Sequence, residues 1–527
     1  MRERRVVIWS RGIAAAVALC LIVAATSARA GGLYGLVIGV DDYAGTANDL
    51  DGAVNDANDV AQALRRLGAR EVIRLVNGEA SKDRIAAAWG ELLGKAKEGD
   101  TIVFSYAGHG AREREPPGRH DEADGLNENF LLGGFQSSGP ATRERIVDDE
   151  LFEWMKQADD KRVRVVLVAD SCHSGGMERS ANAAGVKFRK GNFPAVTDDR
   201  LTPAPAEFAK LSEADFDTVT FVGAVAEDKL TPEVTIDGKK RGALSWAFSR
   251  ALEGRADKDG DGEVSEFELL GYIVPAVHAL VESQQTPQVL PLRARSVPLV
   301  TLREAGVQAA TPEDAGALKL KLAVVGGEAG PLAELPYVTI VTDKAAADLI
   351  WSVADGEVEH VVGGVVAENV DVQSIKGVVS KWAALKWLKS QAALSPIEAK
   401  LVTGNQRYAK GERVEIAAEG AKYPHLTLFN LPPDGRVELF IPTTPADAAR
   451  DWRSEGVHES FKVDKPPYGA EHMVAIFSQN DLADLHAALA SMNNAERAEA
   501  LRPLLEATLA GQDVQIGILD IYTGAGG

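Results

Sequence analysis

Two apolar segments of this 527-residue chain end in small residues beside a side chain that can do chemistry. The segment "VFSYAGHG" contains His109, and the segment "LVADSCHSGG" contains Cys172. A thiol with a pKa of about 8.5 is mostly protonated at neutral pH, and a neighbouring imidazole can accept its proton. The thiolate can then attack a carbonyl carbon, and the imidazolium can protonate a leaving amine. The two residues therefore predict nucleophilic catalysis if the fold brings them together.

The surrounding pattern predicts the elements that would do this. Runs rich in Val and Ile indicate strands, and Gly-terminated amphipathic helices lie between them. The expected strands are 33–40, 71–76, 100–108, 162–170 and 218–226, and the expected helices include 55–68 and 81–99. This alternation predicts an α/β fold with a mainly parallel sheet flanked by helices. In such a sheet, reactive groups gather beyond the carboxyl ends of neighbouring strands.

Each of the two residues also has a purely structural interpretation, as a turn histidine or a small buried hydrophobic side chain. The matched strand–turn contexts favour a Cys172–His109 dyad. His173 is the less favoured base, because adjacent side chains of an extended segment point apart. The backbone N–H groups of Gly110 and Cys172 are expected to bind the oxyanion.

Two carboxylates are candidates for substrate binding. Asp170 lies two residues before the thiol, and Asp56 follows the first expected strand. Carboxylates lining a pocket would select a cationic side chain, Arg above all, through bidentate pairing. Asp56 could instead cap the helix that it opens.

The motifs "SYAGHG" and "DSCHSG" resemble those of caspase-like cysteine peptidases, specifically metacaspases and their bacterial relatives, over residues 33–300. The resemblance implies the caspase–haemoglobinase fold, His109 as general base, Cys172 as nucleophile, and peptide cleavage after Arg or Lys through an acyl-enzyme. It also implies that the loop 177–215 divides two subunit-like portions and offers Arg and Lys residues for self-cleavage. The alternative is a catalytically silent, calcium-binding scaffold of the same fold.

The segment "DKDGDGEVSEFE" has the spacing of an EF-hand loop, residues 257–268. Its expected Ca²⁺ ligands are Asp257, Asp259, Asp261, Glu263 through its carbonyl, and Glu268. An acidic surface turn could imitate this pattern.

A second calcium site is implied by the resemblance near Asp148, Asp149 and Asp124, although Arg179 stands where many relatives have an acid. The same Asp148–Asp149 pair also fits an acidic helix start.

The first 30 residues have a basic start, an apolar stretch and an A-x-A ending at Ala30, which predicts a secretory signal peptide. A signal anchor is the alternative. Cleavage would remove Cys20 and leave Cys172 without a disulfide partner in an exported, periplasmic or secreted protein. No later segment has 18 uninterrupted apolar residues, so no membrane span is expected after signal removal.

The net charge limits the kinds of partner that the protein is expected to bind. A net charge of −20 argues against nucleic-acid binding. The resemblance implies peptide or protein substrates with Arg or Lys at the cleavage site. The expected domains are 31–302 (peptidase), 316–395 (a small α/β region) and 400–527 (a β-rich C-terminal module). The last resembles a module appended to bacterial caspase-like proteins, and we expect it to bind an unknown protein partner or to position the peptidase.

Overall fold

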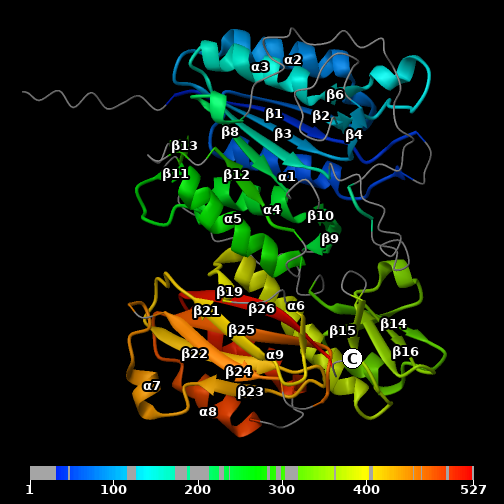
Figure 1. The fold of residues 1–527 in the computed structure, drawn as a ribbon, viewed down its shortest axis with the longest axis vertical. Coiled ribbons are helices and arrows are strands. Elements are labelled where there is room, and N and C mark those ends of the chain that lie inside the picture. Colours follow the sequence, from blue (N-terminus) through cyan, green and yellow to red (C-terminus); the bar gives the residue numbers. More distant parts are fainter. Residues whose placement is uncertain are drawn as a thin grey trace, which may run out of the picture.

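The computed structural model describes residues 31–524, apart from residues 45–47, 115–125, 173–186, 190–212, 225–230, 237, 282–284, 292, 294–297, 303–317, 361–363, 403–406, 455, 464–465 and 494–497. The predicted signal peptide and most of the loop 177–215 lie outside the described residues. The described chain has an N-terminal half around a six-stranded sheet and a C-terminal half built on three further sheets (Figure 1).

The sheet of the N-terminal half has the strand order β12-β8-β7-β3-β1-β2. Its strands are β1 (Leu33–Gly39), β2 (Glu71–Val76), β3 (Thr101–Ala107), β7 (Arg164–Asp170), β8 (Val219–Gly223) and β12 (Gln288–Leu290). All neighbours pair in parallel except β8 and β12. The nearly continuous apolar sequences of β1, β3 and β7 correspond to burial on both faces of the sheet. The predicted mainly parallel sheet is confirmed.

Helices cover both faces of this sheet (Figure 1). On one face, α2 (Lys82–Lys95) and α3 (Asp148–Asp160) contribute Trp89 and Met155 to a core shared with Phe104 of β3. The helices on the other face are α1 (Ala53–Arg66), α4 (Ala243–Arg250) and α5 (Glu266–Val281), which share a second core with the sheet. The flanking helices predicted from sequence are therefore present.

Short strands that the sequence pattern did not predict complete the N-terminal half. They are β4 (Gly110–Arg114), β5 (Leu126–Leu131), β6 (Arg145–Val147), β9 (Glu233–Ile236), β10 (Lys239–Gly242), β11 (Glu263–Ser265) and β13 (Pro298–Thr301). β4 begins directly after His109, and β9 begins at Glu233. Two of these strands therefore start at residues of the site described below.

The C-terminal half contains a five-stranded sheet of order β15-β14-β16-β17-β18, followed by helix α6 (Ile375–Leu394). Its strands are β14 (Leu320–Val325), β15 (Val338–Val341), β16 (Leu349–Ser352), β17 (Glu357–His360) and β18 (Gly364–Ala367). A three-stranded sheet, β19-β21-β24, and a second five-stranded sheet, β20-β26-β25-β22-β23, follow. Their strands are β19 (Ala399–Leu401), β20 (Arg407–Ala409), β21 (Arg413–Ala418), β22 (His425–Leu431), β23 (Glu438–Ile441), β24 (Val457–Lys462), β25 (Ala470–Ser478) and β26 (Val514–Gly524).

Strands β22 and β23 form an antiparallel hairpin around the turn "PPDG". Gly435 in that turn has φ +81°, a conformation that favours glycine. Helices α7 (Pro445–Ala449), α8 (Ala483–Met492) and α9 (Ala498–Leu509) accompany these strands. They were not part of the sequence-based expectation of a β-rich module.

One hydrophobic core joins residues from both sequence segments of the C-terminal half. It includes Leu322 and Trp351 of the first five-stranded sheet, Leu385 of α6, and Phe429 and Ile476 of the second. Helix α6 lies between these sheets and the N-terminal half (Figure 1). The two segments therefore pack as one unit.

The two halves meet where α5 packs against α6. The Tyr272 hydroxyl donates a buried hydrogen bond of 2.9 Å to the Ala393 carbonyl. Ala393 lies in the core of the N-terminal half, and Ala279 of α5 lies in the core of the C-terminal half. Each half thus inserts a residue into the other. No helix within the described ranges is long and apolar enough to cross a membrane.

Candidate active site

His109 and Cys172 follow two strands that lie side by side in the sheet. β3 and β7 pair in parallel, with Ala107 opposite Asp170 at their carboxyl ends. His109 and Cys172 each come two residues after this pair, and their side chains are buried. Gly108 has no room for a side chain, because a Cβ there would lie 2.6 Å from the Tyr106 hydroxyl oxygen. The topology therefore brings the predicted imidazole and thiol to one edge of the sheet.

The imidazole of His109 is held by the loop after β1. Its Nε2 lies 2.7 Å from the Asn48 carbonyl oxygen, which can only accept, so Nε2 carries a proton. The His109 backbone N–H donates to the Tyr43 hydroxyl at 2.8 Å, and the two rings are 4.6 Å apart. Burial lowers the pKa of His109 to about 4, with the positive charge of Arg189 acting in the same direction. At neutral pH the ring is therefore uncharged, and Nδ1 is its basic nitrogen.

Cys172 is buried against Thr231, the residue two positions before β9. Its Sγ accepts a hydrogen bond from the Thr231 backbone N–H at 2.7 Å. Burial raises the pKa of the thiol to about 11, although the Thr231 contact and the charge of Arg189 lower it. Buried in this way, Cys172 is therefore a protonated thiol at neutral pH.

A carbonyl group of the chain itself lies between these residues. The Arg189 carbonyl oxygen accepts hydrogen bonds from the backbone N–H of Gly110 at 3.1 Å and of Cys172 at 3.2 Å. These are the two groups predicted to bind an oxyanion. Their convergence on one carbonyl oxygen is the geometry that an oxyanion hole requires.

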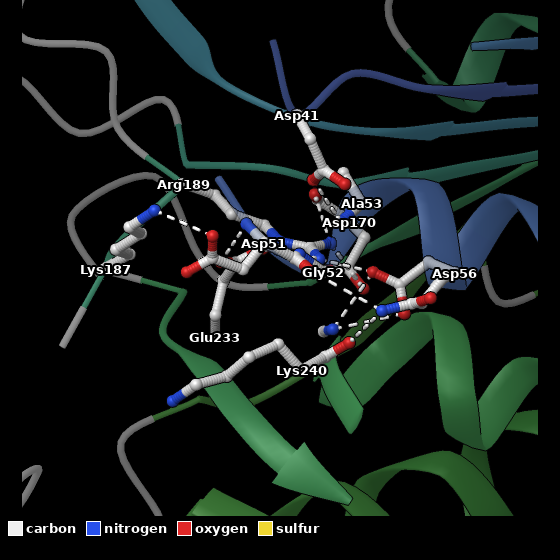
Figure 2. A network of polar contacts seen from close by, with 12 residues as sticks. Asp41, Asp51, Gly52, Ala53, Asp56, Asp170, Lys187, Arg189, Glu233 and Lys240 are labelled. Carbon is white, nitrogen blue, oxygen red and sulfur yellow. Dashed lines mark hydrogen bonds and ion pairs between the residues drawn. The ribbon is translucent and has the colours of Figure 1, made fainter. Parts of the chain in front are cut away.

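The side chain of Arg189 enters an acidic pocket and has no exposed surface. Figure 2 shows its guanidinium among carboxylates. It lies 3.1 Å from Asp170 Oδ2 and 3.5 Å from Glu233 Oε1, and it donates a short hydrogen bond to Asp56. The predicted pocket residues Asp56 and Asp170 thus converge on one arginine. Asp56 does not cap α1, whose first N–H groups donate instead to Asp41.

The pocket carboxylates are fixed by backbone N–H groups. Asp56 accepts from Gly242, and Asp170 accepts from Ser245 at 2.8 Å. Burial raises the pKa of Asp56 and of Glu233, while the charge of Arg189 opposes that effect. The pocket therefore favours a cationic occupant, since an empty pocket would hold several buried carboxylates without a counter-charge.

Residues 187–189 pair with residues 231–233 through a short antiparallel bridge. The Arg189 N–H donates to the Thr231 carbonyl at 3.0 Å, and the Glu233 N–H donates to the Lys187 carbonyl at 2.9 Å. Phe188 and Pro232 form the bridge between the two segments. An extended peptide added to a sheet edge is a common mode of peptide recognition.

Several residues of this site were missed from the sequence. Glu233 begins a short polar strand, and Asn48 contributes only a backbone carbonyl, so neither has a recognisable motif. Arg189 lies in the loop that was expected to offer self-cleavage sites, but no sequence signal distinguishes it from the other basic residues there. His173, Asp124 and Arg179 lie outside the described residues.

The predicted calcium loop lies before α5, away from the thiol. Ligand oxygens of Asp257, Asp259 and Asp261 lie within 4.8 Å of one another. Gly262, at the sharp turn, has φ +83°, and Glu268 faces back to accept from the Lys258 N–H at 3.0 Å. The segment Glu263–Ser265 forms β11 and pairs antiparallel with β13. These residues fit a hard cation with oxygen ligands.

Asp148 and Asp149 occupy the first turn of α3, as the helix-start interpretation expects. Asp148 accepts from the Glu128 N–H, and Asp149 accepts from the Asn127 side chain. A second calcium site at this position stays a prediction.

Comparisons with known proteins match this half of the chain. A family model for the metacaspase peptidase C14 domain matches residues 34–179. Metacaspase-1 of Mycosarcoma maydis is 26% identical over 251 residues, which cover 40% of this chain and 60% of that protein. Metacaspase-1 of Candida albicans is 31% identical over 258 residues, which cover 40% of this chain and 56% of that protein. The chain thus spans about three fifths of the length of these relatives.

Solved structures similar to this chain include a structural-genomics protein from Geobacter sulfurreducens. It is 22% identical, covers 52% of this chain and 97% of its own, and has a TM-score of 0.35. The Drosophila initiator caspase Dronc is 13% identical, covers 49% of this chain and 78% of its own, and has a TM-score of 0.29. The family match to residues 34–179, the metacaspase relatives and the helix-flanked sheet agree with the expectation from the two motifs. Residues 34–179 are therefore similar to the peptidase C14 domain of metacaspases, a caspase-like peptidase family.

Proposed function

We propose that the protein is a cysteine endopeptidase that cleaves peptide bonds after Arg, and after Lys less efficiently, with Cys172 as nucleophile and His109 as general base. One observation supports this most strongly. Arg189 has its guanidinium among the pocket carboxylates and its carbonyl oxygen on the N–H groups of Gly110 and Cys172. In the proposed reaction, this carbonyl group is the one that the thiol attacks.

The proposed reaction begins with transfer of the Cys172 proton to His109 as the sulfur attacks the carbonyl carbon. The tetrahedral oxyanion is stabilised by the N–H groups of Gly110 and Cys172, where one donor typically contributes a factor of about 10²–10³ to kcat. His109 then protonates the leaving amine, and the acyl-enzyme forms. Water, deprotonated by His109, releases the acid and regenerates the thiol.

The preference for Arg follows from the shape of the pocket. The carboxylates of Asp56, Asp170 and Glu233 surround a planar guanidinium with several donors. A lysine ammonium is a point charge with three donors and cannot reproduce this fork geometry. We therefore expect Lys substrates to be accepted but cleaved more slowly.

The same contacts support self-cleavage of the bond between Arg189 and Lys190. Arg189 lies in the loop 177–215, and its segment is paired with residues 231–233 as a substrate would be. Of the described basic residues in this loop, Arg189 is the one whose carbonyl contacts the oxyanion donors.

We also propose that Ca²⁺ binds the loop 257–268. Asp257, Asp259, Asp261 and Glu268 would provide side-chain oxygens, and Glu263 would provide its carbonyl. A bound cation would neutralise the clustered carboxylates and fix the start of α5, which offers a route to calcium-dependent activity.

A fluorogenic peptide ending in Arg tests the proposed activity. Residues 31–527 should release the fluorophore, whereas Cys172→Ala should not. Asp170→Asn should lower kcat/KM for the Arg peptide by at least about 100-fold, because it removes one charge from a buried ion pair. Equal signal from the wild type and Cys172→Ala would favour the catalytically silent scaffold instead.

The same preparations report self-cleavage by mass spectrometry. The wild type should yield a fragment ending at Arg189, and both Cys172→Ala and Arg189→Gln should lack it. Arg143→Gln changes an exposed arginine outside the loop 177–215. This matched control should still be cut after Arg189. Cleavage at the same bond in Cys172→Ala would point to a contaminating protease.

A further inference from the structure

A second acidic contact involves the segment 187–189 that carries Arg189, away from the arginine pocket. Lys187 Nζ lies 2.9 Å from Asp51 Oδ1. Lys187 precedes Arg189 by two residues. We propose that Asp51 is a specificity-determining residue that makes the groove prefer Lys or Arg two positions before the cleaved arginine. This inference rests on the proposed endopeptidase function.

The pairing of residues 187–189 with residues 231–233 determines which substrate positions face the loop that carries Asp51. In an extended strand, residues i and i+2 point to the same face. Lys187 and Arg189 therefore both face the loop and helix start that carry Asp51 and Asp56, while Phe188 is paired with Pro232. A peptide bound in the same register would place its third residue from the cleavage site next to Asp51.

Glu233 connects the two acidic contacts. Its Oε2 accepts from the Asp51 N–H, and its Oε1 accepts from the Gly52 N–H, both at 2.9 Å. The same Oε1 lies 3.5 Å from the Arg189 guanidinium (Figure 2). Gly52 has no space for a side chain, since a Cβ would lie 2.8 Å from Glu233 Oε1. Asp51 is thus held at a fixed distance from the arginine pocket by a buried carboxylate.

The expected size of the effect of Asp51 on selectivity follows from the solvent exposure of the Asp51–Lys187 ion pair. The side chains of Asp51 and Lys187 retain 52% and 39% of their exposed surface, whereas Arg189 and Asp170 are fully buried. Solvent-exposed ion pairs contribute little and are screened by salt. Asp51 should therefore change selectivity by about three-fold, while the arginine pocket determines whether cleavage occurs.

Two fluorogenic peptides, Lys-Phe-Arg and Met-Phe-Arg, test this with the wild type and Asp51→Asn. Methionine has a similar length to lysine but no charge. The wild type should cleave the Lys peptide about three-fold more efficiently in kcat/KM, and high salt should reduce the difference. Asp51→Asn should lose the preference while cleaving the Met peptide at the wild-type rate.

Asp42→Asn is the matched control, since it removes an exposed carboxylate from the same loop and should keep the preference. Self-cleavage provides a second readout: Lys187→Met and Asp51→Asn should each slow the cut after Arg189, and the double variant should be no slower. Equal cleavage of both peptides by the wild type, or an unchanged preference in Asp51→Asn, would overturn the role of Asp51 alone. Absence of any cleavage by the folded wild type would overturn the proposed function itself.

Discussion

Burial shifts the pKa values of the two proposed catalytic groups in opposite directions. The pKa of Cys172 is raised and that of His109 is lowered, so both are neutral between these values. Neither residue has appreciable exposed surface while the Arg189 side chain occupies the acidic pocket. In this state the thiolate must form during attack rather than before it. The oxyanion donors and the pocket then contribute most when charge develops on the substrate oxygen.

The depressed pKa of His109 predicts how stability depends on pH. An unfolded histidine has a pKa of about 6.5, so the unfolded chain binds more protons than the folded one between pH 6.5 and about 4. Stability should therefore fall as pH decreases through this window, by about 3 kcal/mol from this group. Denaturant unfolding of Cys172→Ala and of Cys172→Ala with His109→Gln measures the difference. If the stability of both proteins changes with pH in the same way, the lowered pKa of His109 in the folded protein is contradicted.

At the scale of elements, the sequence predicted the strands that position the thiol and the imidazole but not the walls of the pocket. β3 and β7 are long and apolar because they are buried on both faces, so their pattern is strong. Glu233 begins a four-residue strand of mixed polarity, and its role depends on pairing with residues 187–189. Such contacts depend on three-dimensional proximity, which a local pattern does not encode. The contact between Asp51 and Lys187 is invisible in the sequence for the same reason.

The predicted calcium loop, residues 257–268, supports a prediction at this scale. Three carboxylates within 4.8 Å repel one another without a cation. Ca²⁺ should therefore raise the Tm of the wild type by several degrees, while Asp261→Asn should respond weakly and, without Ca²⁺, be at least as stable as the wild type. Differential scanning calorimetry with Ca²⁺ or Mg²⁺ measures both effects. Asp83→Asn, in the first turn of α2, is a control that should keep the full response; a wild-type Tm unchanged by millimolar Ca²⁺ would contradict the site.

At the scale of the whole molecule, the two halves exchange buried residues across α5 and α6. The Tyr272–Ala393 hydrogen bond is fully buried, and the cores on either side each contain a residue from the opposite half. Helix α5, which follows the predicted calcium loop, is the helix that contacts the C-terminal half.

This contact predicts that the two halves unfold together. Tyr272→Phe leaves a buried carbonyl without its donor, which should cost about 1–3 kcal/mol. In the Cys172→Ala background, tryptophan fluorescence and circular dichroism should show one transition, shifted as a whole by the substitution. The control is Tyr468→Phe, which removes the hydroxyl of a half-buried tyrosine in the C-terminal half and should shift the transition less. Two separate transitions, with only one shifted, would show that the halves are independent.

Arg189 follows Cys172 by only 17 positions in the chain, and this connection has a consequence for turnover. After hydrolysis the new carboxyl terminus would remain attached to β7, because residues 173–188 still link it to the nucleophile. A ligand joined by so short a tether has an effective concentration on the order of millimolar. An incoming protein would then compete with an end product that cannot diffuse away. Under the proposed function, the protein would act only on abundant or tightly bound targets until the tether itself is cut.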